Sequence, residues 1–187
     1  GKADGLNANV SAGYGILNRY NANASLNYRK GKINVFGGYA FHYSKFNNRY
    51  VEERRITVDD TLTYYNLNAL FVERNRHHNV KAGIDVFVND NGTFTYTSST
   101  NFSNGTWTSR TLGDNLNSDK VLSQRFDSRN VEPGKNISVS NDLAYTHKID
   151  TNGQEISASV THTWVTGSSQ SMLNSLAYDS SGSEMPY

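Results

Sequence analysis

The feature that most constrains this chain is a strict two-residue alternation of apolar and polar side chains near its N-terminus. Between residues 6 and 14 every even position is apolar or aromatic, and every odd position is Asn, Ser or Gly. The pattern returns over residues 20–28 and, with the odd positions mostly apolar, over 33–43. A period of two indicates strands with one apolar face. Each run approaches the length of about 9–11 residues that a tilted membrane-spanning strand needs, whereas most soluble strands are shorter.

Composition supports a protein with one apolar surface rather than a large buried core. Hydrophobic residues make up 36 % and aromatic residues 12 % of 187 residues, yet the mean hydropathy is only -0.65. A membrane β-barrel reconciles these values, because one face of each strand meets lipid and the other lines a polar lumen. The formal net charge of +1, with basic residues scattered along the chain, gives no electrostatic case for binding nucleic acid.

Two further features exclude other classes. The chain has no Cys, which excludes disulfide scaffolds and thiolate metal sites. It has no apolar run of about 18 residues, so a transmembrane helix is excluded. It also has no basic and apolar leader at its start. We therefore expect that a leader was removed or that residue 1 is not the natural beginning.

The alternation predicts seven strands, near residues 6–15, 20–29, 33–44, 77–89, 93–102, 138–149 and 155–165. Tight turns are expected at 30–32, 89–92 and 150–153, where Gly follows polar or charged residues. Two polar, weakly patterned stretches, near 45–63 and 103–136, are interpreted as long loops; for the first, a strand pair projecting into water is the alternative. Its charges (Glu52, Glu53, Arg54, Arg55, Asp59 and Asp60) favour a solvated hairpin over a substrate grip.

Short turns at one end and long connections at the other are the asymmetry of outer-membrane barrels, whose long loops face outward. Seven strands cannot close such a barrel, since bacterial barrels have an even number of at least eight. The predicted fold is therefore all-β: an antiparallel up-and-down transmembrane β-barrel that is incomplete. It would contribute about seven strands of a larger barrel, with open edges, and residues 1–187 would be the N-terminal part of the barrel domain.

The alternation also assigns side chains to the two faces. The residues expected to face lipid are apolar and lie mid-strand or at the aromatic strand ends: Leu6, Val10, Leu26, Val35, Val80, Ile84, Val160 and Trp164. The residues expected to face the lumen, or a plug within it, are Asn7, Asn9, Asn21, Asn23, Asn27 and Arg29.

Four segments resemble the first barrel strands of TonB-dependent outer-membrane receptors, and most closely the Bacteroidota-type outer membrane β-barrel family. They are GKADGLNANVSAGYG, RYNANASLNYRKGKINVFGGY, HHNVKAGIDVFVNDNGTF and NDLAYTHKIDTNGQEISASV, of which the block at 20–39 is the most specific. The resemblance covers roughly half the chain and fails in the two expected loops. It implies an upstream plug domain and a barrel of about 22 strands. No residue that contacts the energising complex can be carried over to this chain.

No constellation of residues indicates catalysis or a cofactor. His77 and His78 are adjacent on a strand, so they point to opposite faces and cannot jointly chelate a metal. The Asn- and Asp-rich turns lack the spacing of a calcium loop, and Gly13-Tyr14-Gly15 lacks the rest of a dinucleotide fingerprint. No nucleophile motif occurs. The sequence therefore predicts a non-enzymatic protein without a metal or cofactor.

By resemblance, such a receptor lies in the outer membrane of a Gram-negative bacterium and imports a scarce nutrient, for example an iron chelate, a cofactor, a glycan or a peptide. Its partners would be outer-membrane lipid, its own plug domain, the TonB complex acting through that plug, and an unidentified small or oligomeric substrate. The sequence leaves three alternatives: a small envelope barrel of structural or adhesin type, a soluble β-sandwich binding module and, weakest, an outer-membrane hydrolase.

Overall fold

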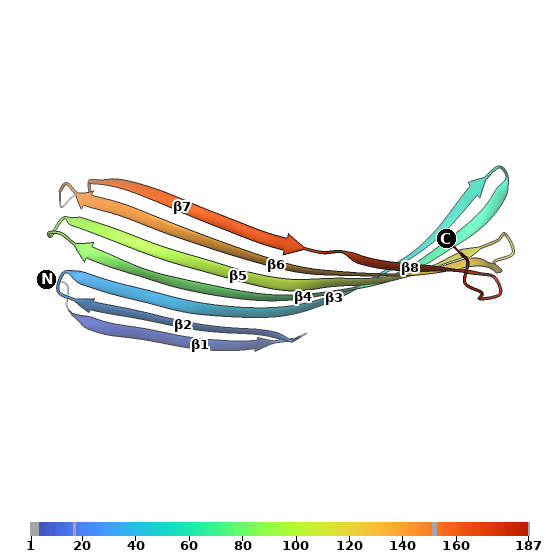
Figure 1. Ribbon diagram of the computed structural model, residues 1–187, viewed down its shortest axis with the longest axis horizontal. Coiled ribbons are helices and arrows are strands. Elements are labelled where there is room, and N and C mark those ends of the chain that lie inside the picture. Colours follow the sequence, from blue (N-terminus) through green and yellow to red (C-terminus); the bar gives the residue numbers. More distant parts are fainter. Residues whose placement is uncertain (1–3, 17, 151–152, 187) are drawn as a thin grey trace. The chain divides into compact units, whose positions relative to one another are not determined.

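The computed structural model describes residues 4–16, 18–150 and 153–186, which contain strands and turns but no helix. This confirms the prediction of an all-β chain. Eight strands are present in this part of the chain (Figure 1): β1 (Gly5–Gly15), β2 (Arg19–Lys30), β3 (Ile33–Val58), β4 (Thr61–Phe87), β5 (Gly92–Leu116), β6 (Leu122–Lys148), β7 (Glu155–Ser169) and β8 (Met172–Asp179).

The strands follow one another in the sheet in the order of the sequence, from β1 to β7, and β8 pairs with β6. The pairing of β1 with β2 is antiparallel and places Tyr14 opposite Tyr20. The pairing of β2 with β3 is also antiparallel and places Tyr20 opposite Tyr43. The predicted up-and-down order is therefore confirmed. The sheet is not closed, because β1 and β7 stand at the two ends of the order.

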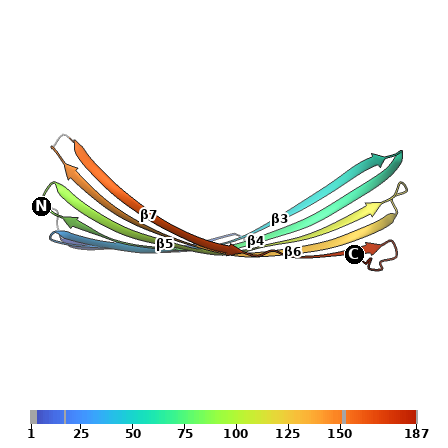
Figure 2. The ribbon, with the colours of Figure 1, turned by 45° about the horizontal axis from the view of Figure 1, so that its top comes forward.

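The chain divides into two compact units. Unit 1 comprises Gly1–Ser44, Asn75–Asn104 and Lys135–Ser168, and unit 2 comprises Lys45–Arg74, Gly105–Gly134 and Ser169–Tyr187. Unit 1 thus holds β1, β2 and nearly all of β7, unit 2 holds β8, and β3 to β6 contribute a segment to each. Within each unit the strands lie side by side in a single layer (Figure 2).

The two stretches interpreted as long loops are mostly strands, so the loop interpretation was wrong, whereas the strand pair given as the alternative for residues 45–63 is confirmed. Residues 45–58 belong to β3, residues 103–116 to β5 and residues 122–136 to β6. Their actual connections are short. Asp59 and Asp60, with φ of 47° and 59°, form the turn between β3 and β4, which is the two-residue hairpin geometry that suits twisted strands. These strands form because cross-strand ion pairs and ring contacts replace the simple apolar alternation on which the prediction relied.

Side chains close the tight turns of unit 1, which gather at one of its ends (Figure 1). The Asp4 carboxylate accepts a hydrogen bond of 2.7 Å from the backbone N–H of Gly31, whose φ is 55°. The Asn89 side-chain oxygen accepts bonds of 2.9 and 2.6 Å from the N–H groups of Asn91 and Gly92. The turns predicted at 30–32 and 89–92 are confirmed. Of the third, residues 151–152 lie outside the described residues.

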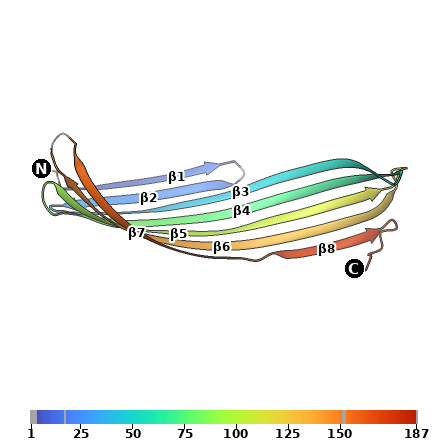
Figure 3. The same cartoon turned by 90° about the horizontal axis from the view of Figure 1, so that it is seen from above.

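The Ser-rich tail, for which no strand was predicted, contributes β8 to unit 2. Val131 of β6 pairs with Met172 at the start of β8 (Figure 3). Just before it, the N–H of Gln170 donates to the carbonyl of Pro133 at 3.1 Å. Pro133 has no N–H to return that bond, so the ladder is interrupted at the junction between β7 and β8.

Among the described residues, neither unit has a core of large apolar side chains buried between two layers. Ala69 is the one buried apolar residue in the described part of the chain, and Asn34 and Ser109 are its buried polar residues. Large apolar side chains are instead exposed. The sheet is therefore held together by its ladder and by contacts between neighbouring strands rather than by packing against a second layer.

Gly83 shows how close these contacts are. A Cβ at Gly83 would lie 2.3 Å from the Phe36 ring and 2.8 Å from the backbone oxygen of Tyr96. We therefore predict that Gly83→Ala lowers the free energy of unfolding by about 1–3 kcal/mol, because the ring must move. Gly5→Ala is the control, since a Cβ there meets nothing within 4 Å. Equal urea midpoints for the two variants would contradict the prediction.

Candidate functional surfaces

The apolar face of unit 1 is assembled by the register of its strands. Residues that pair directly share a face, so Leu6 opposite Tyr28 and Val10 opposite Ala24 place the even positions of β1 and β2 together. Tyr28 opposite Val35 adds the odd positions of β3. The Tyr39 hydroxyl lies 2.7 Å from His78 Nδ1, which brings the even positions of β4 to the same face.

The remaining strands of unit 1 extend this face. The Phe94 and Tyr145 ring centroids lie 4.5 Å apart with the rings tilted, which places the even positions of β5 with the odd positions of β6. Thr161 and Thr163 bond to Asp142 and Ser140 on the other side, so the even positions of β7 join the apolar face. All eight residues predicted to face lipid therefore lie on one face: Leu6, Val10, Leu26, Val35, Val80, Ile84, Val160 and Trp164.

These apolar side chains are highly exposed, which is unfavourable for a protein that is surrounded by water alone. Val10 is 81 % exposed, Val160 71 %, Leu6 67 % and Trp164 52 %, whereas Ile84 is half-buried. Contiguous apolar surface of this extent marks a site that another apolar phase or molecule covers.

Aromatic residues border the apolar face at both ends. At one end the rings of Tyr14 and Tyr20 lie 5.9 Å apart, and those of Tyr20 and Tyr43 lie 4.9 Å apart. At the other end are Tyr28, on β2, and the Phe94–Tyr145 pair. Tyr20 and Tyr28 are eight residues apart on β2, a separation of about 26 Å along the strand. The band between the rows is mostly aliphatic, with Tyr39 opposite Ala24 within it. Two aromatic rows around an aliphatic band are typical of outer-membrane strands.

The opposite face of unit 1 is rich in amides and hydroxyls. All six residues predicted to face the lumen lie there: Asn7, Asn9, Asn21, Asn23, Asn27 and Arg29. Asn23 donates to the Ser11 hydroxyl at 3.3 Å, and Asn79 donates to Asn101. Near the tight turns, buried Asn34 donates to Asp85 at 2.9 Å. These contacts form a hydrogen-bonded polar surface, in contrast to the apolar one behind it.

Two contacts between side chains on this polar face escaped the sequence analysis. The Arg29 guanidinium lies 4.0 Å from the Phe87 ring centroid, and its buried Nε has no hydrogen-bond partner in the described part of the chain. The rings of His42 and His77 lie 6.3 Å apart, beside Asn21, Asn79 and Asn101 in a shallow hollow. Both contacts join neighbouring strands, so a single-strand pattern does not reveal them. His78 points to the other face, as predicted for adjacent strand residues.

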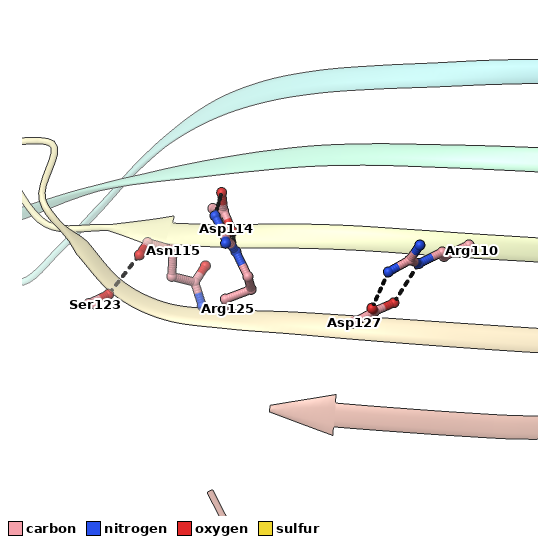
Figure 4. A network of polar contacts seen from close by, with 6 residues as sticks. All are labelled: Arg110, Asp114, Asn115, Ser123, Arg125 and Asp127. Carbon is pink, nitrogen blue, oxygen red and sulfur yellow. Dashed lines mark hydrogen bonds and ion pairs between the residues drawn. The ribbon is translucent and has the colours of Figure 1, made fainter. Parts of the chain in front are cut away.

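In unit 2 the charged residues form cross-strand ion pairs (Figure 4). Arg110 on β5 makes two bonds to Asp127 on β6, at 3.1 and 2.7 Å, and Arg125 makes two to Asp114, at 2.6 and 2.9 Å. We call the surface that carries these pairs the charged face of unit 2. The hydrogen bonds from Arg110 hold the pKa of the Asp127 carboxyl below its usual range. The sequence did contain a signal, because each pair lies at nearly equal distances from the turn at 117–121.

The other face of unit 2 carries ring pairs. Tyr65 and Phe126 lie 6.2 Å apart, and Phe71 and Trp107 lie 5.6 Å apart. Phe126 lies over Gly113, where a Cβ would come within 1.9 Å of the ring. On this face Glu52 also pairs with Arg54, and the hydrogen bond from Arg54 lowers the Glu52 pKa. The predicted solvated hairpin is therefore a paired strand segment with its own side-chain contacts.

Comparison with known proteins adds no family assignment: no protein-family model and no curated protein matches this chain. Among the residues that the structure describes, no helix is long and apolar enough to cross a membrane. Within the same ranges, no three His, Cys, Asp or Glu side chains converge as a metal site would require.

The Arg110–Asp127 pair predicts a defined acid response. Because the Asp127 pKa is lowered in the folded state, its stabilising contribution is complete above about pH 4 and is lost as the pH falls through the lowered value. Titration of the Asp127 carboxyl carbon by NMR should show this low midpoint, and Arg110→Gln should raise it. An unchanged midpoint in Arg110→Gln would contradict the prediction.

Proposed function

We propose that this chain is part of the β-barrel of an outer-membrane receptor that imports a scarce nutrient, in the manner of the TonB-dependent receptors it resembles. One observation carries the proposal: unit 1 has an exposed aliphatic face between two aromatic rows and a polar face behind it. Such a layer is stable where hydrocarbon covers one side and water or polar protein covers the other. A soluble sandwich would bury the apolar face against a second sheet, whereas each unit here is a single layer.

The open edges of the sheet support a larger barrel. β1 and β7 stand at the ends of the strand order. Strands with free edges within a bilayer would leave backbone groups unsatisfied, which hydrocarbon does not tolerate. Closing β1 directly on β7 would pair parallel strands, since both are odd members of an antiparallel order. An odd number of further strands therefore completes the barrel, in accord with the even counts of bacterial barrels.

The polar face of unit 1 would then line the lumen, where a plug domain is its proposed partner. Arg29 suits this role, because its guanidinium lies over the Phe87 ring at the edge of a surface of amides. A carboxylate of the plug would bind its terminal nitrogens through charge-assisted hydrogen bonds. Unit 2, one face of which carries ion pairs, would lie outside the hydrocarbon. Its ring pairs and charges would then be available to a nutrient.

Membrane assembly tests the proposal most simply. Val10→Arg should block assembly, at a cost of about 2–4 kcal/mol, because it places a charge in hydrocarbon. Asn9→Arg is the matched control, since the neighbouring position faces the lumen and should tolerate the change far better. Heat-modifiable migration of the extracted protein reports the folded barrel. Equal loss of assembly in both variants would overturn the lipid-facing assignment.

Energised import separates the proposed receptor from a structural barrel or an adhesin. In cells that assemble the protein, iron chelates, cofactors, glycans and peptides would be offered in turn as labelled nutrients. Dissipating the proton gradient should stop uptake of the active nutrient and leave its binding at the cell surface intact. Assembly without energy-dependent uptake of any class would contradict the receptor function while leaving the membrane barrel in place.

A further inference from the structure

Three basic side chains, Lys45, Arg49 and Arg74, lie on the charged face of unit 2 with no carboxylate beside them among the residues that the structure describes. The bond from Arg49 to Asn68, at 3.0 Å, shows that odd positions of β3 share a face with even positions of β4. Lys45 and Arg74 therefore belong to that face, whereas Arg129 lies beside Asp127 and is not counted with them. The positions next to Lys45, Arg49 and Arg74 on this face hold no carboxylate: 47 on β3, 68, 70 and 72 on β4, and 106 and 108 on β5.

This absence contrasts with the rest of unit 2. Arg110 and Arg125 are each held by an aspartate through two bonds, and on the opposite face Arg54 pairs with Glu52. Lys45 is half-exposed, and Arg49 and Arg74 are exposed. The three form a positive surface that attracts an external anion, and we call them the basic row.

The position of the basic row along the strands indicates what that anion is. Lys45 follows Tyr43, a member of the aromatic row, by two residues on β3. Arg74 precedes Arg76 by two residues on β4, and the Arg76 guanidinium lies 5.9 Å from the Tyr43 ring centroid. Along both strands, positive charge thus begins where the aromatic border ends. In a membrane-spanning strand this is the level of the lipid headgroups.

We propose that the basic row binds the phosphate groups of anionic glycolipid in the outer leaflet of the membrane. Arginine presents a planar fork that matches phosphate oxygens, and lysine adds a point charge. Two arginines and one lysine would neutralise the phosphates of neighbouring headgroups, which otherwise repel one another. This inference rests on the proposed membrane location of unit 1, and it adds a specific lipid partner to it.

The test uses the natural full-length polypeptide in detergent micelles and vesicles of neutral phospholipid that contain lipid A, the bisphosphorylated anchor of bacterial glycolipid. Each charge near such a surface contributes about a five-fold change in affinity. The double variant Lys45→Gln with Arg74→Gln should therefore bind lipid A about 25-fold more weakly. Arg54→Gln is the matched control, because it removes one positive charge from the same unit on the opposite face and should leave binding unchanged.

Each outcome bears on the proposal. Weaker binding of the double variant, with Arg54→Gln unaffected and dephosphorylated lipid A bound poorly, supports it. Equal binding of the double variant and the unaltered protein overturns it, as does an equal loss in Arg54→Gln. Displacement of lipid A by millimolar inorganic phosphate would assign the row to a soluble anion instead. Bilayer insertion is measured separately by alkaline extraction. Failure to insert overturns the proposed function itself, whereas insertion without lipid A selectivity overturns this inference alone.

Discussion

The register between β1, β2 and β3 is the constraint on which the rest of the structure depends. It sets Leu6 against Tyr28, and Tyr20 between Tyr14 and Tyr43, so that one face becomes aliphatic with aromatic borders. A slip of one residue would bring the asparagines of β2 to that face and destroy the separation. Because each unit is a single layer, no core could compensate for such a slip. The register of this ladder therefore determines the polarity of each face, and the proposed environment follows from that polarity.

The same strands carry a different chemistry in each unit. Tyr39, Phe41 and Tyr43 occupy odd positions of β3 in unit 1, whereas Phe46 and Tyr50 occupy even positions in unit 2. Most aromatic residues of β3 thus change from odd to even positions between the two units, although Phe36 in unit 1 is at an even position. In unit 2 the charged face carries ion pairs and the basic row beside the exposed side chains of Val51 and Leu70. A strand that leaves hydrocarbon for water would be expected to change its outward side chains in this way.

The sequence predicted the parts of the fold in which the side-chain pattern of a single strand shows which face is apolar. β1, β2 and β7 alternate strictly, and the turns at Gly31 and Asn89 carry recognisable turn residues, so their positions and faces could be inferred. The strand segments of unit 2 could not, because their order depends on partners across the ladder, such as Asp127 for Arg110. β8 was missed for a related reason: it lies in a Ser-rich tail, and its apolar side chains fall at both even and odd positions, so it shows no strict alternation. The contacts of Arg29 with Phe87 and of His42 with His77 likewise exist only once neighbouring strands are aligned.

The central claim is that the aliphatic face of unit 1 touches hydrocarbon. The chain has two tryptophans, and Trp164 belongs to that face whereas Trp107 lies in unit 2. In a variant whose only tryptophan is Trp164, the most direct measurement is fluorescence quenching by phospholipids brominated on their acyl chains. The account predicts strong quenching of Trp164 by these lipids and weak quenching by aqueous acrylamide. Strong quenching by acrylamide, with none by brominated lipid, would contradict it.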